Sequence, residues 1–442
     1  MPEAATSVSF VTLGCRLNQA DTHQLQTLLE ARGYRTVSEA QRADVVVVNT
    51  CAVTARAELS DRQAIRRAAR LSPDARIVVT GCWAQTSPGE VAELDGVDLV
   101  VGNPDKARLP DLLAATSAGR PRVEVSAVTA ARLSAVAARP HPNGRARALV
   151  KVQDGCQHRC AFCIVPRARG QSRSLEPAAV EAQVRSLVEA GHPEVVLTGV
   201  DLGHYGADLR PRSTLAALLA RLAAVPGLRW LRLSSLLPAY FTDDLLEVVT
   251  TSPVIAPHLH VPLQSGSDRV LHRMRRPYTA AMYRRVVERL AAAIPRLGLG
   301  ADVLVGFPGE TAADFDATRT LVEALPFSYL HVFPFSPRAQ TEAAGLPDRV
   351  DAWTVRARAR TLREIAAIRA RRFREAMVGR IEEALVLDTR ERAGGRLVGL
   401  TGNFVEVTFA GPDRMQGRLV RVRVTAAGEH AALGVLEDAQ AA

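Results

Sequence analysis

The chain has 442 residues, 47% of them hydrophobic and 23% charged, a balance typical of folded, soluble domains. No apolar stretch approaches the roughly 20 residues needed to cross a bilayer, and the first residues lack a signal-peptide pattern. These features argue against a membrane or secreted protein, so we expect a cytoplasmic one without a membrane partner. The net charge of +10 points to a polyanionic partner. The alternative is biased composition, since Lys106 and Lys151 are the only lysines among 56 basic residues.

The first hundred residues repeat one pattern three times: a buried-looking strand, a cysteine, and a helical stretch. The strands "VSFVTLGC", "ADVVVVNTC" and "ARIVVTGC" end at Cys15, Cys51 and Cys82. Continuous apolar strands that alternate with helices predict a parallel sheet. Because ligands gather at the carboxyl ends of such strands, we expect the three cysteines to lie close together at a site. Any one of them could be only a small buried hydrophobe, but three repeats make that explanation weak.

A second series of strands and helices begins near residue 146. Six candidate strands predict a partial or complete parallel barrel, with functional residues at the carboxyl ends of the strands. They are "RALVKVQDG", "EVVLTGV", "WLRLSSL", "HLHVPLQ", "LGADVLVGF" and "YLHVFPFS".

The loop "DGCQHRCAFCIVP" follows the first of these strands and brings Cys156, Cys160 and Cys163 within eight positions. In a reducing compartment such cysteines are better explained by metal binding or catalysis than by disulfides. Zinc sites usually have four protein ligands, or three with an open catalytic position. Three cysteines without a fourth suit an iron–sulfur cluster with one open iron better. We expect His158, inside the loop, to face solvent or substrate.

The last 65 or so residues contain short alternating strands with glycine turns, which predict a small β-barrel. In "GRLVRVRVT", Arg421 and Arg423 share one face and the valines share the other. That arginine face could follow a phosphate backbone, although a merely solvated face has the same pattern. We expect this domain to contribute affinity rather than chemistry.

These patterns predict a multidomain α/β protein. We assign residues 6–118 to an N-terminal parallel α/β domain and 119–141 to a linker rich in Ala, Arg and Pro, with at most one short strand. Residues 142–374 form the central (β/α) partial barrel, and 375–442 form the C-terminal β-barrel.

The C-x3-C-x2-C spacing, with Phe162 before the last cysteine, is typical of the radical S-adenosylmethionine (SAM) superfamily. Over nearly its whole length the chain resembles the methylthiotransferases of that superfamily, which end in a TRAM β-barrel. The carrying motifs include "TLGCRLNQAD", "NTCAVT", "GCWAQ", "HLHVPLQSGSDRVLHRMRR", "DVLVGFPGE" and "LHVFPFSPR". Several of these look most like the branch that acts on N6-threonylcarbamoyladenosine in tRNA.

The resemblance implies two [4Fe–4S] clusters, one in the central domain and an auxiliary one in the N-terminal domain. Cys156, Cys160 and Cys163 would hold the first, and a second trio at the N-terminal sheet would hold the other. That second set is Cys15, Cys51 and Cys82. SAM would serve as radical source and as methyl donor, and the product would carry a methylthio group at C2 of the nucleoside at position 37, next to the anticodon. Implied partners are tRNA, an electron donor such as flavodoxin or ferredoxin, and a sulfur donor system.

The resemblance also implies a set of cofactor-binding residues near the barrel mouth: Phe162, Gly199, Ser234, Gln264 and Gly306. Gly306 has an equally good explanation as a simple loop turn. Arg167 and Arg169 are candidates to contact substrate or the methionine carboxylate.

Two kinds of alternative remain open. The same chemistry could act on isopentenyladenosine in tRNA or on a ribosomal protein. In a different class, the chain could be a non-catalytic iron–sulfur or zinc protein that binds RNA. An electron carrier is poorly supported, because carriers fill all four iron positions with protein ligands.

Overall fold

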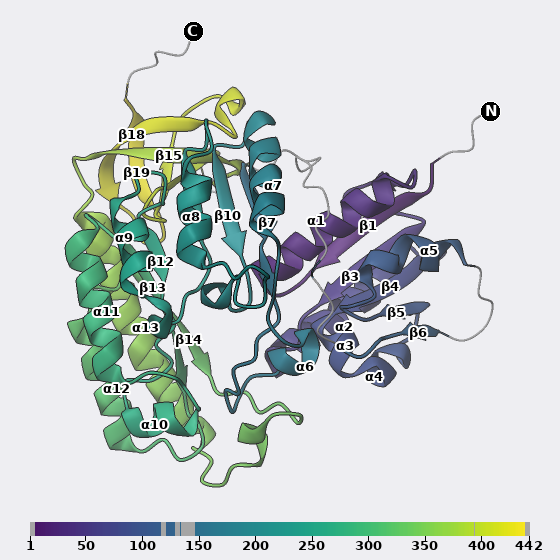
Figure 1. The fold of residues 1–442 in the computed structure, drawn as a ribbon, viewed down its shortest axis with the longest axis horizontal. Helices are drawn as coiled ribbons and strands as arrows, with labels where there is room; N and C mark the ends of the chain where they lie inside the picture. The colour runs from purple at the N-terminus through teal and green to yellow at the C-terminus, as the bar shows by residue number, and fades with distance from the viewer. Residues whose placement is uncertain (1–4, 116–120, 129–132, 134–145, 393, 438–442) are drawn as a thin grey trace.

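The structure is a computed structural model that describes residues 5–115, 121–128, 133, 146–392 and 394–437. The described part of the chain contains a six-stranded sheet, a partial barrel and a small closed barrel (Figure 1). Most of the linker predicted at 119–141 lies outside the described residues. No helix in the described ranges is long and apolar enough to cross a membrane.

The N-terminal sheet is parallel throughout, with strand order β2-β1-β3-β4-β5-β6. Its strands are β1 (Ser7–Thr12), β2 (Arg35–Thr36), β3 (Val45–Thr50), β4 (Arg76–Gly81), β5 (Leu99–Val101) and β6 (Arg122–Glu124). The last strand comes from the segment that the sequence suggested as a linker. The central strand β3 is buried along its whole length, as its run of four valines predicts.

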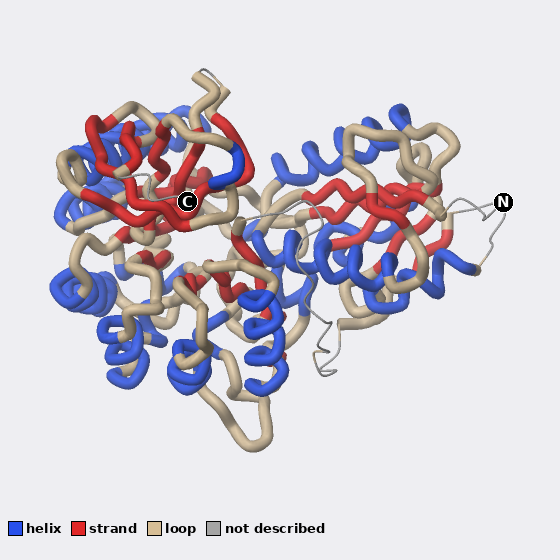
Figure 2. Tube along the Cα trace, turned by 90° about the horizontal axis from the view of Figure 1, so that it is seen from above, coloured by secondary structure: helices blue, strands red, loops and turns tan. Residues whose placement is uncertain are grey.

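Helices cover both faces of this sheet (Figure 2). One face packs against α1 (Arg16–Glu30) and α5 (Leu109–Ala114), and the other against α2 (Ala55–Leu71), α3 (Cys82–Thr86) and α4 (Pro88–Ala92). The 17-residue α2 is capped at its N-terminus by Thr54, whose side chain accepts a hydrogen bond from the backbone of Ala57. The predicted N-terminal parallel α/β fold is confirmed.

The central domain contains the six predicted strands as two parallel three-stranded sheets. They are β7 (Arg147–Lys151), β10 (Glu194–Thr198), β11 (Trp230–Leu233), β12 (His258–His260), β13 (Gly298–Val305) and β14 (Tyr329–Pro334). A parallel bridge between Leu231 and Ile255 joins the two sheets, so the strands form an open barrel in the order β7-β10-β11-β12-β13-β14. The prediction of a partial barrel is confirmed.

Helices pack around the outside of this barrel and share one large apolar core with its strands. They are α7 (Pro177–Glu189), α8 (Leu215–Ala223), α9 (Asp243–Thr251), α10 (Asp268–Arg273), α11 (Ala280–Ala293), α12 (Ala312–Ala324) and α13 (Ala352–Glu375). The interior face of the strands stays more open: on β14, Tyr329 is half-buried and His331 is exposed, whereas Val332 is buried on the outer face.

The C-terminal domain is a closed barrel of five strands in the order β15-β16-β17-β19-β18. The strands are β15 (Ile381–Arg390), β16 (Leu397–Thr401), β17 (Glu406–Phe409), β18 (Leu419–Ala427) and β19 (Ala432–Leu436). On β18, Arg421 and Arg423 are exposed while Val422 and Val424 are buried, as predicted. Arg423 forms an ion pair with Glu437.

This small barrel closes the amino-terminal end of the central one. Phe404, in the turn between β16 and β17, has a φ of 69°, a left-handed conformation that is costly for a bulky residue. Its ring stacks on His258 at 4.2 Å. The fully buried Arg232 donates to Glu194 at 2.8 and 3.2 Å and to the backbone oxygens of the same turn. The C-terminal domain therefore completes the barrel floor, a structural role beyond the RNA affinity expected from sequence.

Candidate active site: two cysteine trios and the charged network between them

The cysteines of the N-terminal domain lie at one edge of its sheet. Cys15 directly precedes α1 just beyond β1, Cys51 directly follows β3, and Cys82 begins α3 directly after β4. These three strands are neighbours, and the pairing of Thr50 with Gly81 puts Cys51 and Cys82 at the same level. The predicted gathering of three strand-end cysteines is thus present in the fold.

Two glycines make this edge possible. Gly14 has a φ of +92°, and a Cβ added there would lie 2.8 Å from the Cβ and 2.9 Å from the Sγ of Cys51. Gly81 has a φ of +100°, and an added Cβ would lie 2.4 Å from the backbone oxygen of Thr50. Only glycine fits both the left-handed backbone and the space beside it. The cysteines can therefore approach one another because the residues that precede two of them have no side chain.

The thiols of this trio influence one another electrostatically. Burial, with a smaller contribution from the charges of Cys82 and Cys15, raises the pKa of the Cys51 thiol to about 12. Burial also raises the pKa of Cys82. Three thiolates in mutual reach repel one another unless a cation lies among them. This donor set is therefore suited to a metal or a metal cluster, which deprotonates thiols when it binds.

The second trio lies in the loop between the first barrel strand and α6 (Val165–Arg169), and backbone hydrogen bonds hold this loop at both ends. Cys156 donates to the oxygen of Gly170 at 2.9 Å, and Cys163 donates to that of Cys160 at 3.0 Å. Phe162 packs edge-on against Phe307 at 6.5 Å. Burial raises the pKa of Cys163 to about 11 and raises that of Cys156.

In neither cysteine trio do all three sulfurs lie as close together as the ligands of a single metal ion. Sulfur ligands of one tetrahedral zinc lie about 3.8 Å apart, as follows from Zn–S bonds of about 2.3 Å. Within the described ranges, the one set of three metal-ligating atoms that all lie within 4.8 Å is His260, Asp302 and His331. In each cysteine trio at least one pair of sulfurs lies farther apart than 4.8 Å, which is wider than one zinc ion requires. All six cysteines are free of disulfides.

The two trios lie on either side of the boundary between the N-terminal and central domains. Helix α6 packs against α3. Ile164 and Ala168 belong to the same apolar core as Cys82 and Trp83, so the cysteine loop of the central domain is anchored in the N-terminal one. The charge of Cys82 contributes to raising the pKa of Cys163, which places these sulfurs in electrostatic reach.

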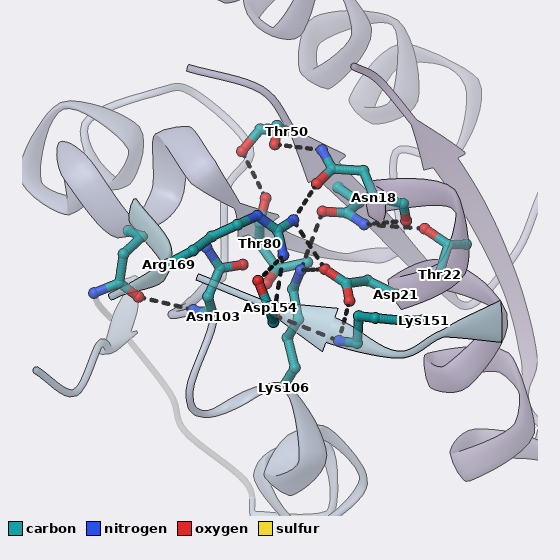
Figure 3. Close-up of polar contacts among 12 residues, drawn as sticks. Asn18, Asp21, Thr22, Thr50, Thr80, Asn103, Lys106, Lys151, Asp154 and Arg169 are labelled. Atoms are coloured by element: carbon teal, nitrogen blue, oxygen red, sulfur yellow. Dashed lines mark hydrogen bonds and ion pairs between the residues drawn. The ribbon is translucent and has the colours of Figure 1, made fainter. Parts of the chain in front are cut away.

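A buried network of charged side chains links the two domains (Figure 3). Asp21 of α1 accepts from Lys106 at 2.7 Å and from Lys151 at 2.5 Å, so both lysines of the protein meet one carboxylate. Arg169, only 2% exposed, donates to Asp21 at 3.1 Å and to Asp154 at 3.1 and 3.2 Å. The three cations hold the pKa of Asp21 well below its usual range despite burial, which acts in the opposite direction.

This network corrects the expectation that Arg169 contacts substrate or methionine. Its guanidinium also donates to Asn18 at 2.6 Å, and a hydrogen bond and its positive charge both act to lower the pKa of Cys82. Because its donors are used by protein groups, Arg169 positions the N-terminal domain against the cysteine loop. Arg167, by contrast, is exposed.

The predicted SAM-site residues other than Phe162 all follow barrel strands at the carboxyl edge. The backbone N–H of Gly199 points to the hydroxyl of Ser234 at 3.4 Å, so these two are brought together. Gln264 has a left-handed φ of 64° and donates its backbone N–H to the backbone oxygen of Asp302 at 2.8 Å. A Cβ on Gly306 would lie 2.4 Å from Val355 of α13, so its packing alone accounts for a glycine there.

Two groups near the site were not singled out from sequence: Tyr240 and Asp201, which hold His158, and a set of side chains inside the barrel. His158 shares a hydrogen bond of 2.8 Å with Tyr240, which donates to Asp201 at 3.1 Å, so that loop histidine is held by the barrel rather than by the cysteines. The second group consists of polar and aromatic side chains on the barrel's interior face. Its members are His258, His260, Asp302, Tyr329 and His331. The period of two in "HLH" and "YLHVF" is the signal that could have identified them.

Two family models match the chain: the uncharacterized protein family UPF0004 over residues 7–102, and the radical SAM superfamily over residues 150–322. Among solved structures, the radical SAM methyltransferase TsrM from Kitasatospora setae superposes with a TM-score of 0.60, covering 77% of each chain. At 18% identity, this likeness concerns the fold alone.

Curated relatives match from end to end. The threonylcarbamoyladenosine tRNA methylthiotransferase MtaB of Bacillus subtilis (strain 168) is 40% identical, covering 96% of this chain and 94% of the relative. The MtaB of Aquifex aeolicus (strain VF5) is 38% identical, covering 94% of this chain and 100% of the relative. A tRNA-2-methylthio-N(6)-dimethylallyladenosine synthase from Cereibacter sphaeroides (strain ATCC 17025 / ATH 2.4.3) is 37% identical, covering 96% and 97%.

Proposed function

The chain belongs to the radical SAM tRNA methylthiotransferases, and on that premise we propose that it adds a methylthio group to C2 of N6-threonylcarbamoyladenosine at position 37 of tRNA. Full-length similarity to relatives that carry this activity in their name is the observation that supports the substrate. The radical SAM family implies a [4Fe–4S] cluster and SAM, and a tRNA methylthiotransferase implies tRNA as the substrate.

We propose that the chain holds two such clusters, one at each trio. Cys156, Cys160 and Cys163 would hold the cluster that binds SAM, and the trio at the N-terminal sheet edge would hold the auxiliary one. When bound, these groups supply the radical and the sulfur, and the protein supplies orientation and shielding. The absence of a fourth cysteine beside either trio supports one open iron in each cluster.

The protein's own residues fix the geometry of the reaction. Helix α6 is packed into the N-terminal core, and Arg169 is held by carboxylates of both domains, so the two cysteine sites cannot move independently. Arg276 donates to the sulfur of Cys160 at 3.2 Å. Gly199, Ser234 and Gln264 offer backbone and side-chain polar groups at the barrel mouth, where we place the SAM pocket.

We further propose the boundaries 6–118, 142–374 and 375–442 for the three domains, a cytoplasmic location, an electron donor such as flavodoxin or ferredoxin, and an external sulfur donor. The closed C-terminal barrel, with Arg421 exposed on β18, is a surface suited to the tRNA backbone.

The proposal is tested by nucleoside profiling of tRNA from a bacterial strain that lacks its own enzyme of this type. Expression of this chain should convert threonylcarbamoyladenosine to its 2-methylthio derivative, and a Cys156→Ala variant should not. If threonylcarbamoyladenosine stays unmodified at C2 in the presence of folded, cluster-loaded protein, the substrate assignment is wrong.

A second substrate is supported by the 37% identity to the dimethylallyladenosine synthase. The same profile distinguishes the two, because the 2-methylthio derivative of dimethylallyladenosine would then appear instead. A dithionite-reduced sample that fails to cleave SAM would instead favour a non-catalytic RNA-binding protein.

A further inference from the structure

The floor of the central barrel carries more positive charge than the protein neutralises. Three arginines surround the ring of Phe404, with the guanidinium carbons of Arg16, Arg232 and Arg147 at 5.4, 5.2 and 5.9 Å from its centroid. Arg232 is paired with Glu194 through two hydrogen bonds. Within the described residues, neither Arg16 nor Arg147 has a carboxylate at ion-pair distance, so two of the three cations lack a partner.

Arg16 connects this floor with the auxiliary site. It immediately follows Cys15 in the first turn of α1 and is half-buried. Its guanidinium carbon lies 5.4 Å from the centroid of the Phe404 ring, which stacks on His258 of β12, so its side chain extends to the barrel floor. A guanidinium offers five N–H donors, and removing one from water without an anion is costly. The position therefore calls for an anion that arrives with a bound molecule.

We propose that Arg16 binds the carboxylate of the threonylcarbamoyl group and so selects this nucleoside over adenosines with an apolar N6 substituent. This inference rests on the proposed function. The threonyl unit is linked through its amino group, so its carboxylate remains free. In adenine only N1 separates C2 from the carbon that bears N6. A base that presents C2 near Cys15 therefore brings its N6 substituent within reach of the next residue.

An apolar N6 substituent would leave the same guanidinium buried without a counterion. A pocket that contains an unpaired charge rejects ligands that cannot pair it, which gives specificity by exclusion as well as by attraction. Glu194 is the carboxylate whose charge acts on Arg16, and two hydrogen bonds already hold it to Arg232. Asp302, on the interior face of β13, lies 3.2 Å from His260.

The methionine end of SAM also carries a carboxylate, so the experiment must separate the two sources. Anaerobically reconstituted protein is titrated, by fluorescence anisotropy, with anticodon stem–loops that differ only at position 37. One carries threonylcarbamoyladenosine, one its methyl ester, and one unmodified adenosine. SAM affinity is measured on the same samples by equilibrium dialysis.

For the wild-type protein we expect the free acid to bind about tenfold more tightly than the ester, the effect of one charge-assisted pair. Arg16→Gln should abolish this preference without changing affinity for the unmodified loop, and Arg16→Lys should keep part of it. The matched control is Arg66→Gln on the exposed face of α2, which removes the same charge from the same domain and should keep the full preference.

Other results would overturn the inference. The inference is wrong if the Arg16→Gln protein still prefers the free acid over the ester. It is also wrong if this variant loses SAM affinity and keeps that preference, because Arg16 would then bind the carboxylate of methionine. Equal weakening for all three loops would indicate a phosphate contact instead. The ester comparison in the wild-type protein does not depend on any variant folding. If the wild-type protein methylthiolates the loop but binds the ester as tightly as the free acid, only this inference fails; if it never methylthiolates the loop, the proposed function fails.

Discussion

The two cysteine sites contrast in how the chain builds them. Cys156, Cys160 and Cys163 come from one loop of eight residues, held by hydrogen bonds to its own ends and to the adjacent barrel. The other trio comes from three separate strands, and nothing but the parallel sheet brings it together. A local loop can form its site with little help from the rest of the domain. A site at a sheet edge exists only when every strand is in register.

The largest expected effect is the separation of two activities by cysteine variants. Cys156→Ala should abolish SAM cleavage, whereas Cys51→Ala should preserve cleavage to 5′-deoxyadenosine and abolish methylthiolation. After anaerobic reconstitution, each variant should lose about four of about eight irons per chain. Iron analysis and product chromatography provide the measurements. A wild-type count that stays near four would remove the auxiliary site and with it the comparison.

The next largest effect concerns the network that holds the two sites together. Asp21→Asn leaves Lys106, Lys151 and Arg169 buried with too little negative charge, so it should cost about 3–5 kcal/mol of stability. Thermal or urea unfolding measures the loss. Asp111→Asn is the matched control, because its pair with Arg32 is exposed and should cost less than about 1 kcal/mol. Equal losses in the two variants would contradict a structural role for the network.

A smaller change tests whether the auxiliary site depends on the sheet edge. Gly81→Ala introduces a Cβ against the backbone of Thr50, so it should reduce iron at the auxiliary site and spare SAM cleavage. Gly33→Ala is the control: its φ of +86° is also left-handed, but an added Cβ meets no atom within 4 Å. It should cost only about 1 kcal/mol. Normal iron content in Gly81→Ala would show that the edge tolerates rearrangement.

The smallest expected effect concerns the reduction potential, which arginines near the cysteine sulfurs should influence. Arg276 donates to Cys160, as Arg169 acts on Cys82. Hydrogen bonds and positive charge at cluster sulfurs raise the reduction potential, so Arg276→Met should shift the midpoint to more negative values. The titration, followed by electron paramagnetic resonance, uses a Cys51→Ala background with one cluster. Arg275→Met, an exposed neighbour paired with Glu342, should leave the midpoint unchanged. A positive shift in Arg276→Met would refute this role.

The fold could be predicted from the sequence because each domain has a strongly periodic pattern of apolar residues. The valine run of β3 and the alternation of β18 lead directly to a buried parallel strand and a half-exposed barrel strand. It also reached the three strand-end cysteines, because a parallel sheet puts all carboxyl ends on one side. These inferences need only local patterns and one topological rule.

The charged network and the barrel floor could not be predicted from the sequence, for a physical reason. Asp21 meets partners 85 and 130 residues away, and such pairs are decided by how domains pack, not by any local pattern. Phe404 has a backbone conformation that its residue type disfavours, so propensity points away from it. The proposed ligand roles of the cysteines are predictions that the variants above test, and the roles of the SAM-site residues stay predictions.

The position of Phe404 in the chain has a consequence for biosynthesis. The ribosome synthesises the central barrel strands before the turn between β16 and β17 that closes their amino-terminal end, because proteins emerge amino-terminus first. Until that late turn arrives, the buried ion pair of Arg232 and Glu194 lacks its backbone acceptors and the aromatic ring that covers it. A nascent chain therefore closes the floor of its central barrel only after the turn between β16 and β17 has been synthesised, well after the last central strand, β14.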